Sequence, residues 1–327
     1  MIKLNVRKFT EASVLSAAFV VLSFLCISIG LGYLGYIDFI VPAFVGIILL
    51  KCDFRYTILS CISSIILIIF VIGDLPSGIM ISQSMILGII ITYFIKKDES
   101  IFDDLFFSCV AACVLMIFVD INFSTLTGYS FLKESRNYLD FIPSTYDKYK
   151  DIILYISIAC LPLGSVIIGY ILTLISSKRF KISNEIVLNK ANIIKNFKRY
   201  GQFTYCTRNV VYIGVLYIIT VIFMNEYIFN NKYSYIVILL NSIMYISVFF
   251  IFHDSFSLIS KCIYGLTKSR AKMIIVQFLL VYSLLALFKY TFAVMIILNL
   301  YFDHKYNIKS KYKQILDNYK KEYMKTI

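Results

Sequence analysis

The sequence has few of the residues from which catalytic and metal sites are built. It holds only two histidines, His253 and His304, and neither lies beside a cluster of acids within an apolar segment. None of its eight cysteines forms a CxxC pair, and the GxSxG, HExxH, GxGxxG and P-loop motifs are absent. We therefore expect no enzyme activity, no catalytic residues, no metal site and no cofactor, and we interpret the cysteines as small apolar core residues.

Acidic residues are scarce as well, whereas apolar residues dominate. The chain has 19 Asp and Glu against 32 Lys and Arg, is 60% hydrophobic and has a mean hydropathy of +0.81. A soluble fold could not bury so much apolar surface, so the expected solvent is a lipid bilayer. The apolar segments are long and continuous, which predicts membrane-spanning helices. The expected fold class is all-α, a polytopic helical membrane protein.

Positive charge predicts the orientation of the chain. Residues 176–208 carry eight Lys and Arg against one acid, Glu185, and further lysines crowd the C-terminal tail. Because short loops rich in Lys and Arg stay in the cytoplasm, this segment and both termini are expected on the cytoplasmic side of a bacterial plasma membrane. The expected partners are therefore the bilayer and its anionic lipids, and not nucleic acid.

Apolar runs predict about ten spans, within a range of eight to ten. The first eight cover about 11–29, 36–50, 56–72, 79–95, 101–120, 152–175, 210–229 and 233–252. The last run, 273–302, would measure roughly 45 Å as a helix, too long for one straight span of a core about 30 Å thick. We interpret it as two spans with Lys289 at the outer turn, because this places the basic tail inside. A single span, which would leave the tail outside, is the alternative.

The pattern divides the chain into four parts. These are a six-helix membrane domain at 1–176, a basic cytoplasmic connector at 177–209, a four-helix membrane domain at 210–303 and a basic cytoplasmic tail at 304–327. The two membrane domains are therefore expected to be joined, and followed, by positively charged cytoplasmic segments.

The connector and the tail each contain an amphipathic pattern. Ile182, Ile186 and Ile193 recur at helical spacing in the connector, which predicts an interfacial helix. This helix would lie among lipid headgroups or, equally well, pack on the cytoplasmic ends of the spans. Tyr312 and Tyr319 recur in the same way in the tail and predict a second surface helix, which we interpret as pressed on anionic lipid.

The polar residues with the clearest functional promise lie near the outer ends of spans two to five. Polar groups within a membrane are costly and often mark a pathway or a site. We predict that five of them line a substrate-binding pocket open to the outside: Asp38, Asp74, Gln83, Asp120 and Asn122. The alternative is that they only contact water and headgroups at the helix ends.

The first predicted helix carries small residues four positions apart. Ala12 pairs with Ser16, and Ser13 pairs with Ala17. Such spacing lets another helix approach closely, so we predict a helix-docking face for another membrane protein. Packing against a neighbouring span of the same chain is the alternative interpretation.

Three stretches of sequence carry a resemblance to a known family. The opening KFTEASVLSAAFVVLSF, the turn LLKCDFRYTIL and the ending LNLYFDHKYNIK resemble the YybS-like family of predicted bacterial membrane proteins, whose function is not established. Residues from about Lys8 to Ser177 resemble the substrate-binding S-components of energy-coupling-factor vitamin transporters. This resemblance implies a half that binds a small solute, with membrane and ATPase subunits of a transporter as partners.

Two functions are consistent with these observations. The leading hypothesis is a protein that binds or transports a small solute from the outer face in the manner of an S-component. The alternative is a membrane scaffold or regulator that recruits cytoplasmic partners or anionic lipids without transport. An intramembrane enzyme acting on lipid-linked substrates is a third, for which the sequence has no visible acid–base constellation.

Overall fold

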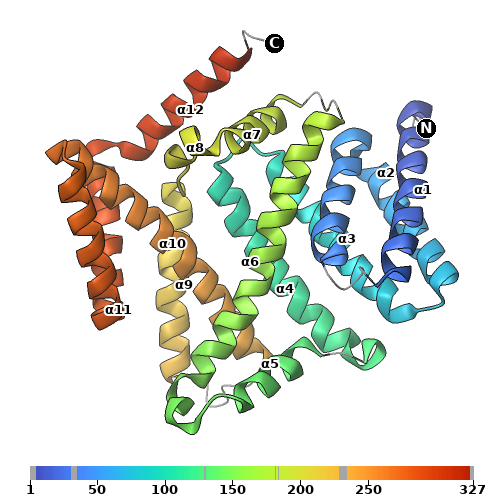
Figure 1. Ribbon diagram of the computed structural model, residues 1–327, viewed down its shortest axis with the longest axis horizontal. Helices are drawn as coiled ribbons and strands as arrows, with labels where there is room; N and C mark the ends of the chain where they lie inside the picture. The colour runs from blue at the N-terminus through green and yellow to red at the C-terminus, as the bar shows by residue number, and fades with distance from the viewer. Residues whose placement is uncertain are drawn as a thin grey trace. The chain divides into compact units, whose positions relative to one another are not determined.

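The computed structural model describes residues 5–30, 35–128, 130–180, 182, 184–227 and 234–324, and almost all of them are helical (Figure 1). In chain order the elements are α1 (Val6–Ser28), η2 (Tyr36–Ile40), α2 (Val41–Ile72), α3 (Leu75–Ile95), α4 (Ile101–Thr127), α5 (Phe131–Asp140), η3 (Ser144–Tyr146), α6 (Asp147–Arg179), α7 (Glu185–Lys195), α8 (Phe197–Tyr200), η4 (Gly201–Phe203), α9 (Arg208–Tyr227), α10 (Tyr235–Thr267), α11 (Arg270–Tyr306) and α12 (Ile308–Met324). Across these described ranges there is no β-strand. The fold class is all-α, as the sequence predicts.

Eight of the described helices are long and apolar enough to cross a membrane. They are α1, α2 together with η2, α3, α4, α6, α9, α10 and α11. The protein is therefore a polytopic, multi-pass membrane protein. The predicted connector and tail helices are present as α7 and α12, while the segment between the predicted spans 101–120 and 152–175 contains the short helix α5.

Helix α2 is continuous in its bounds but consists of two arms. Asp53 divides them with a non-helical backbone (φ 70°, ψ 163°). Val41 and Val45 of the first arm and Cys61 and Ile68 of the second share one buried apolar cluster. A straight helix could not bring these residues together, so the chain reverses near Asp53. The sequence predicts a turn at this point because Lys51 and Arg55 flank it.

Helix α11 also contains a reversal, at Leu287 (φ −140°, ψ 58°). The Thr291 hydroxyl donates to the carbonyl oxygen of Ser283 at 3.0 Å, although eight residues separate them. Eight residues of straight α-helix would span about 12 Å. The segment predicted to be two spans is thus assigned as one helix, α11, but its backbone forms two arms that meet at Leu287. The number of membrane crossings remains a prediction.

The chain forms two compact units. Unit 1 comprises Met1–Glu99, Asp104–Lys195 and Phe229–Tyr245, and unit 2 comprises Ser100–Asp103, Asn196–Ile228 and Ile246–Ile327. The connector is shared between them, because α7 belongs to unit 1 whereas α8 and η4 belong to unit 2. The tail helix α12 belongs to unit 2.

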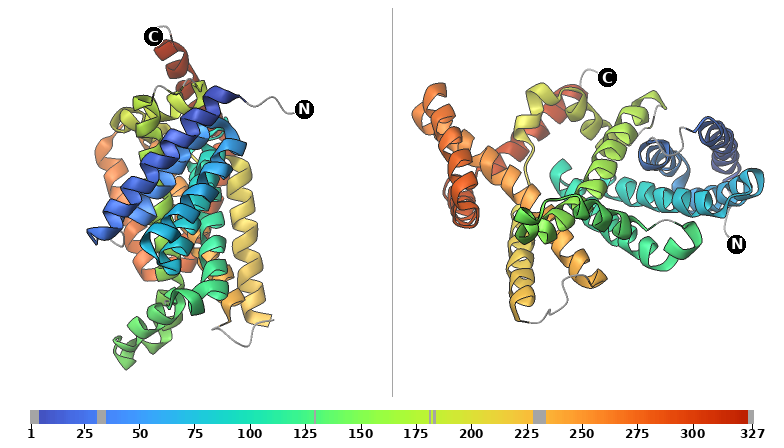
Figure 2. Two further views of the ribbon diagram at one scale, coloured as in Figure 1. Left: turned by 90° about the vertical axis from the view of Figure 1, so that its right-hand side faces the viewer. Right: turned by 60° about the horizontal axis from the view of Figure 1, so that its bottom comes forward.

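The core of unit 1 is built where α1, both arms of α2 and α3 pack together (Figure 2). Phe19, Tyr36 and Met85 are among its buried side chains. Gly88 of α3 lies against α2 so closely that an added Cβ would be 2.8 Å from Pro42 Cα and closer still to its carbonyl oxygen. Glycine is therefore the residue that permits this helix contact.

Candidate functional site

Two buried carboxylates hold the main chain just before α9. The Cys206 N–H donates to Asp254 Oδ1 at 2.9 Å, and the Thr207 N–H donates to Asp103 Oδ1 at 2.9 Å. Asp103 lies in the first turn of α4 and Asp254 lies within α10, and both side chains are buried. The last residues of the connector therefore enter α9 along a path fixed by two acids.

Lys309, near the start of α12, forms a buried ion pair with Asp254. Its Nζ donates to Asp254 Oδ2 at 2.8 Å, and each side chain is only 4% exposed. Asn299 of α11 donates to the same carboxylate oxygen at 3.0 Å. A buried ion pair is tolerated only when further hydrogen bonds satisfy its charged atoms, and the bonds from Asn299 and Cys206 supply them. The tail helix is thus anchored in unit 2 by a charge that the protein covers.

Arg208, at the start of α9, holds the turn between α11 and α12. Its Nε donates to the Asp303 carboxylate, and its Nη2 donates to the Asp303 carbonyl at 3.1 Å and to Asn307 Oδ1 at 2.9 Å. Asn307 ends α11 in the left-handed conformation (φ 49°), which turns the chain into α12. The Lys309 N–H completes the arrangement by donating to Asp303 Oδ1 at 3.0 Å.

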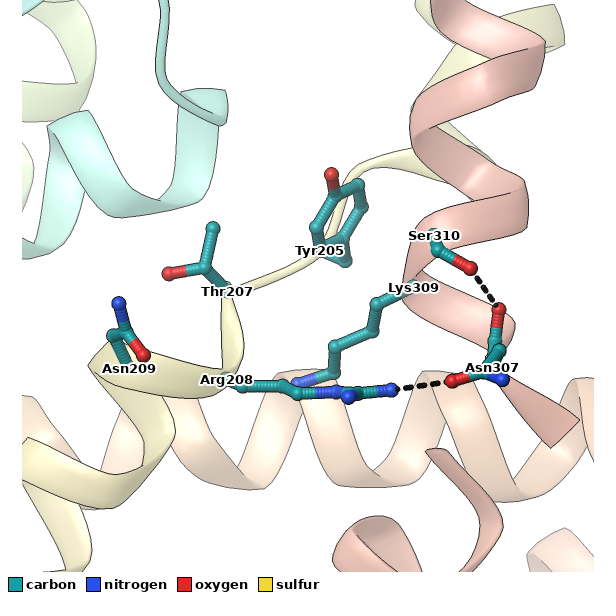
Figure 3. A pocket seen from close by; sticks show the side chains of 7 residues that line it. All are labelled: Tyr205, Thr207, Arg208, Asn209, Asn307, Lys309 and Ser310. Carbon is teal, nitrogen blue, oxygen red and sulfur yellow. Dashed lines mark hydrogen bonds between the residues drawn. The ribbon is translucent and has the colours of Figure 1, made fainter. Parts of the chain in front are cut away.

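An open cavity of about 310 Å³ lies beside this turn (Figure 3). The residues that line it are Tyr205, Thr207, Arg208, Asn209, Asn307, Lys309 and Ser310. Figure 3 shows Arg208 reaching across to Asn307 and Lys309 running down from α12 toward the start of α9. The cavity presents a guanidinium, amides and hydroxyls, which suit the recognition of a carboxylate or phosphate. In the part of the chain that the structure describes, no three His, Cys, Asp or Glu side chains are grouped to hold a metal ion.

Aromatic contacts attach the rest of α12 to the connector. The rings of Tyr200 and Tyr319 stack with centroids 3.8 Å apart, and Asn196 Nδ2 donates to the Tyr319 hydroxyl at 3.0 Å. Two turns closer to the anchor, Tyr312 meets Phe203 edge to face with ring centroids 5.7 Å apart. Burial raises the pKa of the Tyr312 phenol. The tyrosines that predict a lipid-facing side of the tail therefore contact protein.

Unit 1 contains a second lysine that enters a buried site from a connector helix. Lys190 of α7 donates to Asp104 Oδ2 at 2.6 Å, to the Lys97 carbonyl at 2.6 Å and to the Ile95 carbonyl at 3.2 Å. Tyr170 of α6 donates to the same Asp104 oxygen at 2.7 Å. Lys190 thus caps the carbonyl end of α3 while it pairs with α4, and it fixes α7 on the membrane helices.

The five residues predicted to line an outer pocket all belong to unit 1, and three of them have local roles. Asp74 caps α3 by accepting the Ser77 N–H at 3.1 Å. Asp120 accepts the Phe131 N–H at 2.7 Å and so caps α5. Asn122 is exposed and donates to a carbonyl of its own helix at 2.7 Å.

The remaining two predicted pocket residues lie on different elements. Asp38 is exposed on η2, and Gln83 is half-buried on α3. Among the residues described, no hydrogen bond links any two of the five predicted pocket residues. Their role in binding a substrate stays a prediction.

The small residues of α1 separate into two faces. Ala12 and Ser16 are buried against the second arm of α2, where Ser16 Oγ lies 2.7 Å from Ser64 Oγ. Ser13 and Ala17 are exposed. The first pair therefore packs within the chain, and only the second pair is presented outward for another helix.

Sequence reasoning missed the buried acids and their lysines. We interpreted the positive residues of the connector and tail as determinants of orientation, which gives no reason for Lys190 or Lys309 to be buried. A signal was present in Asp254, because an acid within an apolar helix requires a partner. That partner could not be chosen from the sequence, since 55 residues separate Asp254 from Lys309.

Comparison with known proteins gives one similarity. Residues 17–153 match the model of a family described as predicted membrane protein (DUF2232). The match covers less than half of the chain and ends near the start of α6. No curated protein and no solved structure matches the sequence. Over this segment the chain is thus similar to a family of predicted membrane proteins, which agrees with its multi-pass membrane localisation.

Proposed function

We propose that the protein is a non-catalytic membrane scaffold, in which the connector and tail of unit 2 form one fixed, basic surface that recruits an acidic cytoplasmic partner. The observation that carries this proposal is the buried Lys309–Asp254 pair. A tail that served only to mark orientation would not need a buried anchor. Anchored by Lys309 and stacked on the connector through Tyr319, the tail is held as part of the folded unit.

The exposed charged residues make this surface basic. The exposed charged residues described in the unit 2 part of the connector and in the tail are five cations, Lys198, Arg199, Lys305, Lys311 and Lys313, against one acid, Asp317. The buried Lys309 is neutralised by Asp254, so it adds little to the field outside. The partially exposed Arg208 lines the cavity at one end of the surface. Such a surface favours an acidic partner through electrostatic complementarity.

Photo-crosslinking in cells tests the scaffold proposal. A photoreactive residue in place of Gln314, which is exposed on α12, should cross-link one protein partner. Reversing Lys311 and Lys313 to glutamate should remove the cross-link. Reversing Lys289, an exposed lysine next to the Leu287 turn of α11, is the matched control and should leave it intact. A cross-link that survives the reversal of Lys311 and Lys313 would refute the proposal.

A second candidate function is favoured by the exposed pair on α1. Ser13 and Ala17 form a small-residue face that no described element covers, and this face would suit docking to a transporter scaffold. With the resemblance to S-components and the YybS-like family, it supports a solute-binding subunit. Its energy would come from partner ATPases.

This second candidate is tested by partner recovery together with ligand stabilisation. Ser13→Leu combined with Ala17→Leu should abolish co-purification of transporter subunits, whereas Val14→Leu, at a neighbouring exposed position, should not. A vitamin or cofactor precursor that is the substrate should raise the melting temperature of the purified protein. If no transporter subunit co-purifies with the protein and no compound stabilises it, the result would count against this function.

A further inference from the structure

A second cavity, of about 500 Å³, lies in unit 1 where α6 meets α7. Leu174, Ile175, Lys178 and Arg179 line it from α6, and Ala191, Ile194 and Lys195 line it from α7. The lining combines two chemistries. Leu174, Ile175, Ala191 and Ile194 make one apolar wall, while three cations stand at the end where α6 stops.

The charged side chains in the described lining of this cavity are all positive. Lys178, Arg179 and Lys195 are all exposed, and no acid belongs to the described lining. The one acid of α7, Glu185, lies at the opposite end of that helix from Lys195. Lys178 Nζ also donates to the Asn192 amide oxygen at 3.4 Å. Three positive charges next to an apolar wall attract an amphipathic anion.

The position of α7 is fixed, so the cavity is a stable feature of unit 1. Lys190 ties the middle of α7 to Asp104 and to the end of α3. Val187 and Asn192 are buried on the same helix. Ile194 and Lys195 are therefore held in place beside the end of α6.

The depth of the cavity in the bilayer selects the ligand. The candidate span of α6 ends at Arg179, and the end of a span is expected at the headgroup layer, so Lys178 and Arg179 are suitably placed for a headgroup phosphate. Leu174 and Ile175 lie one turn deeper, within the span, where acyl chains begin. We propose that this cavity binds an anionic phospholipid, with its phosphate against Lys178, Arg179 and Lys195 and the start of an acyl chain against the apolar wall.

The choice of an anionic phospholipid follows from both halves of the lining. A free phosphate would leave the apolar wall unused, and a zwitterionic headgroup would bring its own cation toward three others. The site is independent of the surface proposed for an acidic partner, because it lies in unit 1.

The absence of tryptophan from the sequence makes the test direct. Ile194→Trp introduces a single tryptophan in the cavity of the full-length protein. In phosphatidylcholine vesicles containing a small fraction of brominated phosphatidylglycerol, its fluorescence should be quenched more strongly than by the same fraction of brominated phosphatidylcholine. Replacing the three cations by glutamine should remove this preference, about fivefold in relative affinity for each cation lost.

Two controls separate a site from general attraction to anionic lipid. Leu216→Trp, on the exposed side of α9, should show the same quenching by both lipids. Neutralising Lys198, Lys311 and Lys313 in the Ile194→Trp protein changes the net charge equally and should preserve the preference. Equal quenching by the two lipids at Ile194→Trp, or a preference that survives removal of Lys178, Arg179 and Lys195, would overturn the proposal.

Two further measurements complete the test. Millimolar glycerol phosphate or inorganic phosphate should not compete with the brominated lipid, and displacement by either would identify a soluble phosphate as the ligand instead. Native mass spectrometry of the protein without tryptophan should show phosphatidylglycerol retained through delipidation. This retention should be lost in the glutamine variant while its melting temperature is unchanged. Loss of lipid only together with unfolding would contradict a specific site.

Discussion

The Lys309 ammonium group donates a hydrogen bond to Asp254 Oδ2 at 2.8 Å, and both side chains are almost fully buried. The pair joins the first turn of the tail helix to α10. Removing one partner of a buried ion pair leaves the other charge without compensation, which typically costs about 3–5 kcal/mol. The anchor should therefore be one of the more sensitive positions in unit 2.

The first prediction concerns this pair. Lys309→Met should lower the melting temperature of the purified protein markedly, because the buried Asp254 carboxyl group would lose its cationic partner. Combining Lys309→Met with Asp254→Asn should restore part of the loss, since no buried charge would then remain. Thermal unfolding of the two single variants and the double variant gives the coupling energy. Strictly additive effects would show that the two groups do not interact.

The second prediction uses Cys206 as a reporter of the anchor. Its thiol is fully buried beside α10, and burial raises its pKa well above the usual value. In a variant whose other cysteines are replaced, Cys206 should react very slowly with a maleimide at neutral pH. Lys309→Met should accelerate labelling by loosening α12. Fast labelling with the anchor intact would contradict the burial of this segment.

The spans could be predicted from the sequence because hydropathy and charge act locally. Lys51 and Arg55 indicated the reversal within α2, and the length of the last apolar run indicated the reversal near Leu287. The two anchors could not be predicted in the same way. The pattern of positive charge is identical whether a lysine faces headgroups or a buried acid, and only the tertiary fold brings Lys190 to Asp104 across 86 residues.

For the candidate pocket residues, the sequence indicates which side chains are polar but not what role each of them has. Asp74 precedes the first residue of α3, and Asp120 lies about two turns before the end of α4. An acid at either position can serve a ligand or simply bond the start of a helix. The structure shows the capping bonds. The sequence of α5, FLKESRNYLD, has no continuous apolar run that predicts a helix, so the bond from Asp120 to the start of α5 could not be predicted.

A third prediction concerns pH. Burial raises the folded-state pKa of Tyr312 above its usual value of 10.0, so the folded protein holds this proton more tightly than the unfolded chain does. The associated stability is fully present below pH 10 and is lost as the pH rises above it. The Tyr312→Phe variant should therefore lose less stability than the unmodified protein between about pH 9 and pH 11, a range that brackets the usual tyrosine pKa of about 10. Tyr290→Phe, at an exposed position, is the control and should follow the unmodified protein.

A fourth prediction concerns the contact between α2 and α3. Gly88→Ala would place a methyl group against the backbone of Pro42, where neither helix can move freely. Overpacking of this kind costs about 1–3 kcal/mol. Gly164→Ala in α6 is a matched control, because an added Cβ there meets no atom within 4 Å and should leave stability unchanged or slightly increased. Similar melting temperatures for the two variants would show that α2 and α3 do not approach closely in the membrane.

The last prediction concerns the reversal in α11. If the two arms on either side of Leu287 both cross the bilayer, Lys289 lies outside and the tail lies in the cytoplasm. A cysteine placed at 289 should then react with a membrane-impermeant maleimide in intact cells, whereas one at 313 should react only after permeabilisation. The hydrogen bond from Thr291 to Ser283 closes the turn, so Thr291→Val should weaken it without altering this pattern. Labelling of both positions from the same side would mean that the arm of α11 after Leu287 does not cross the membrane. If that side were the outside, the basic tail would also have an orientation against the positive-inside rule.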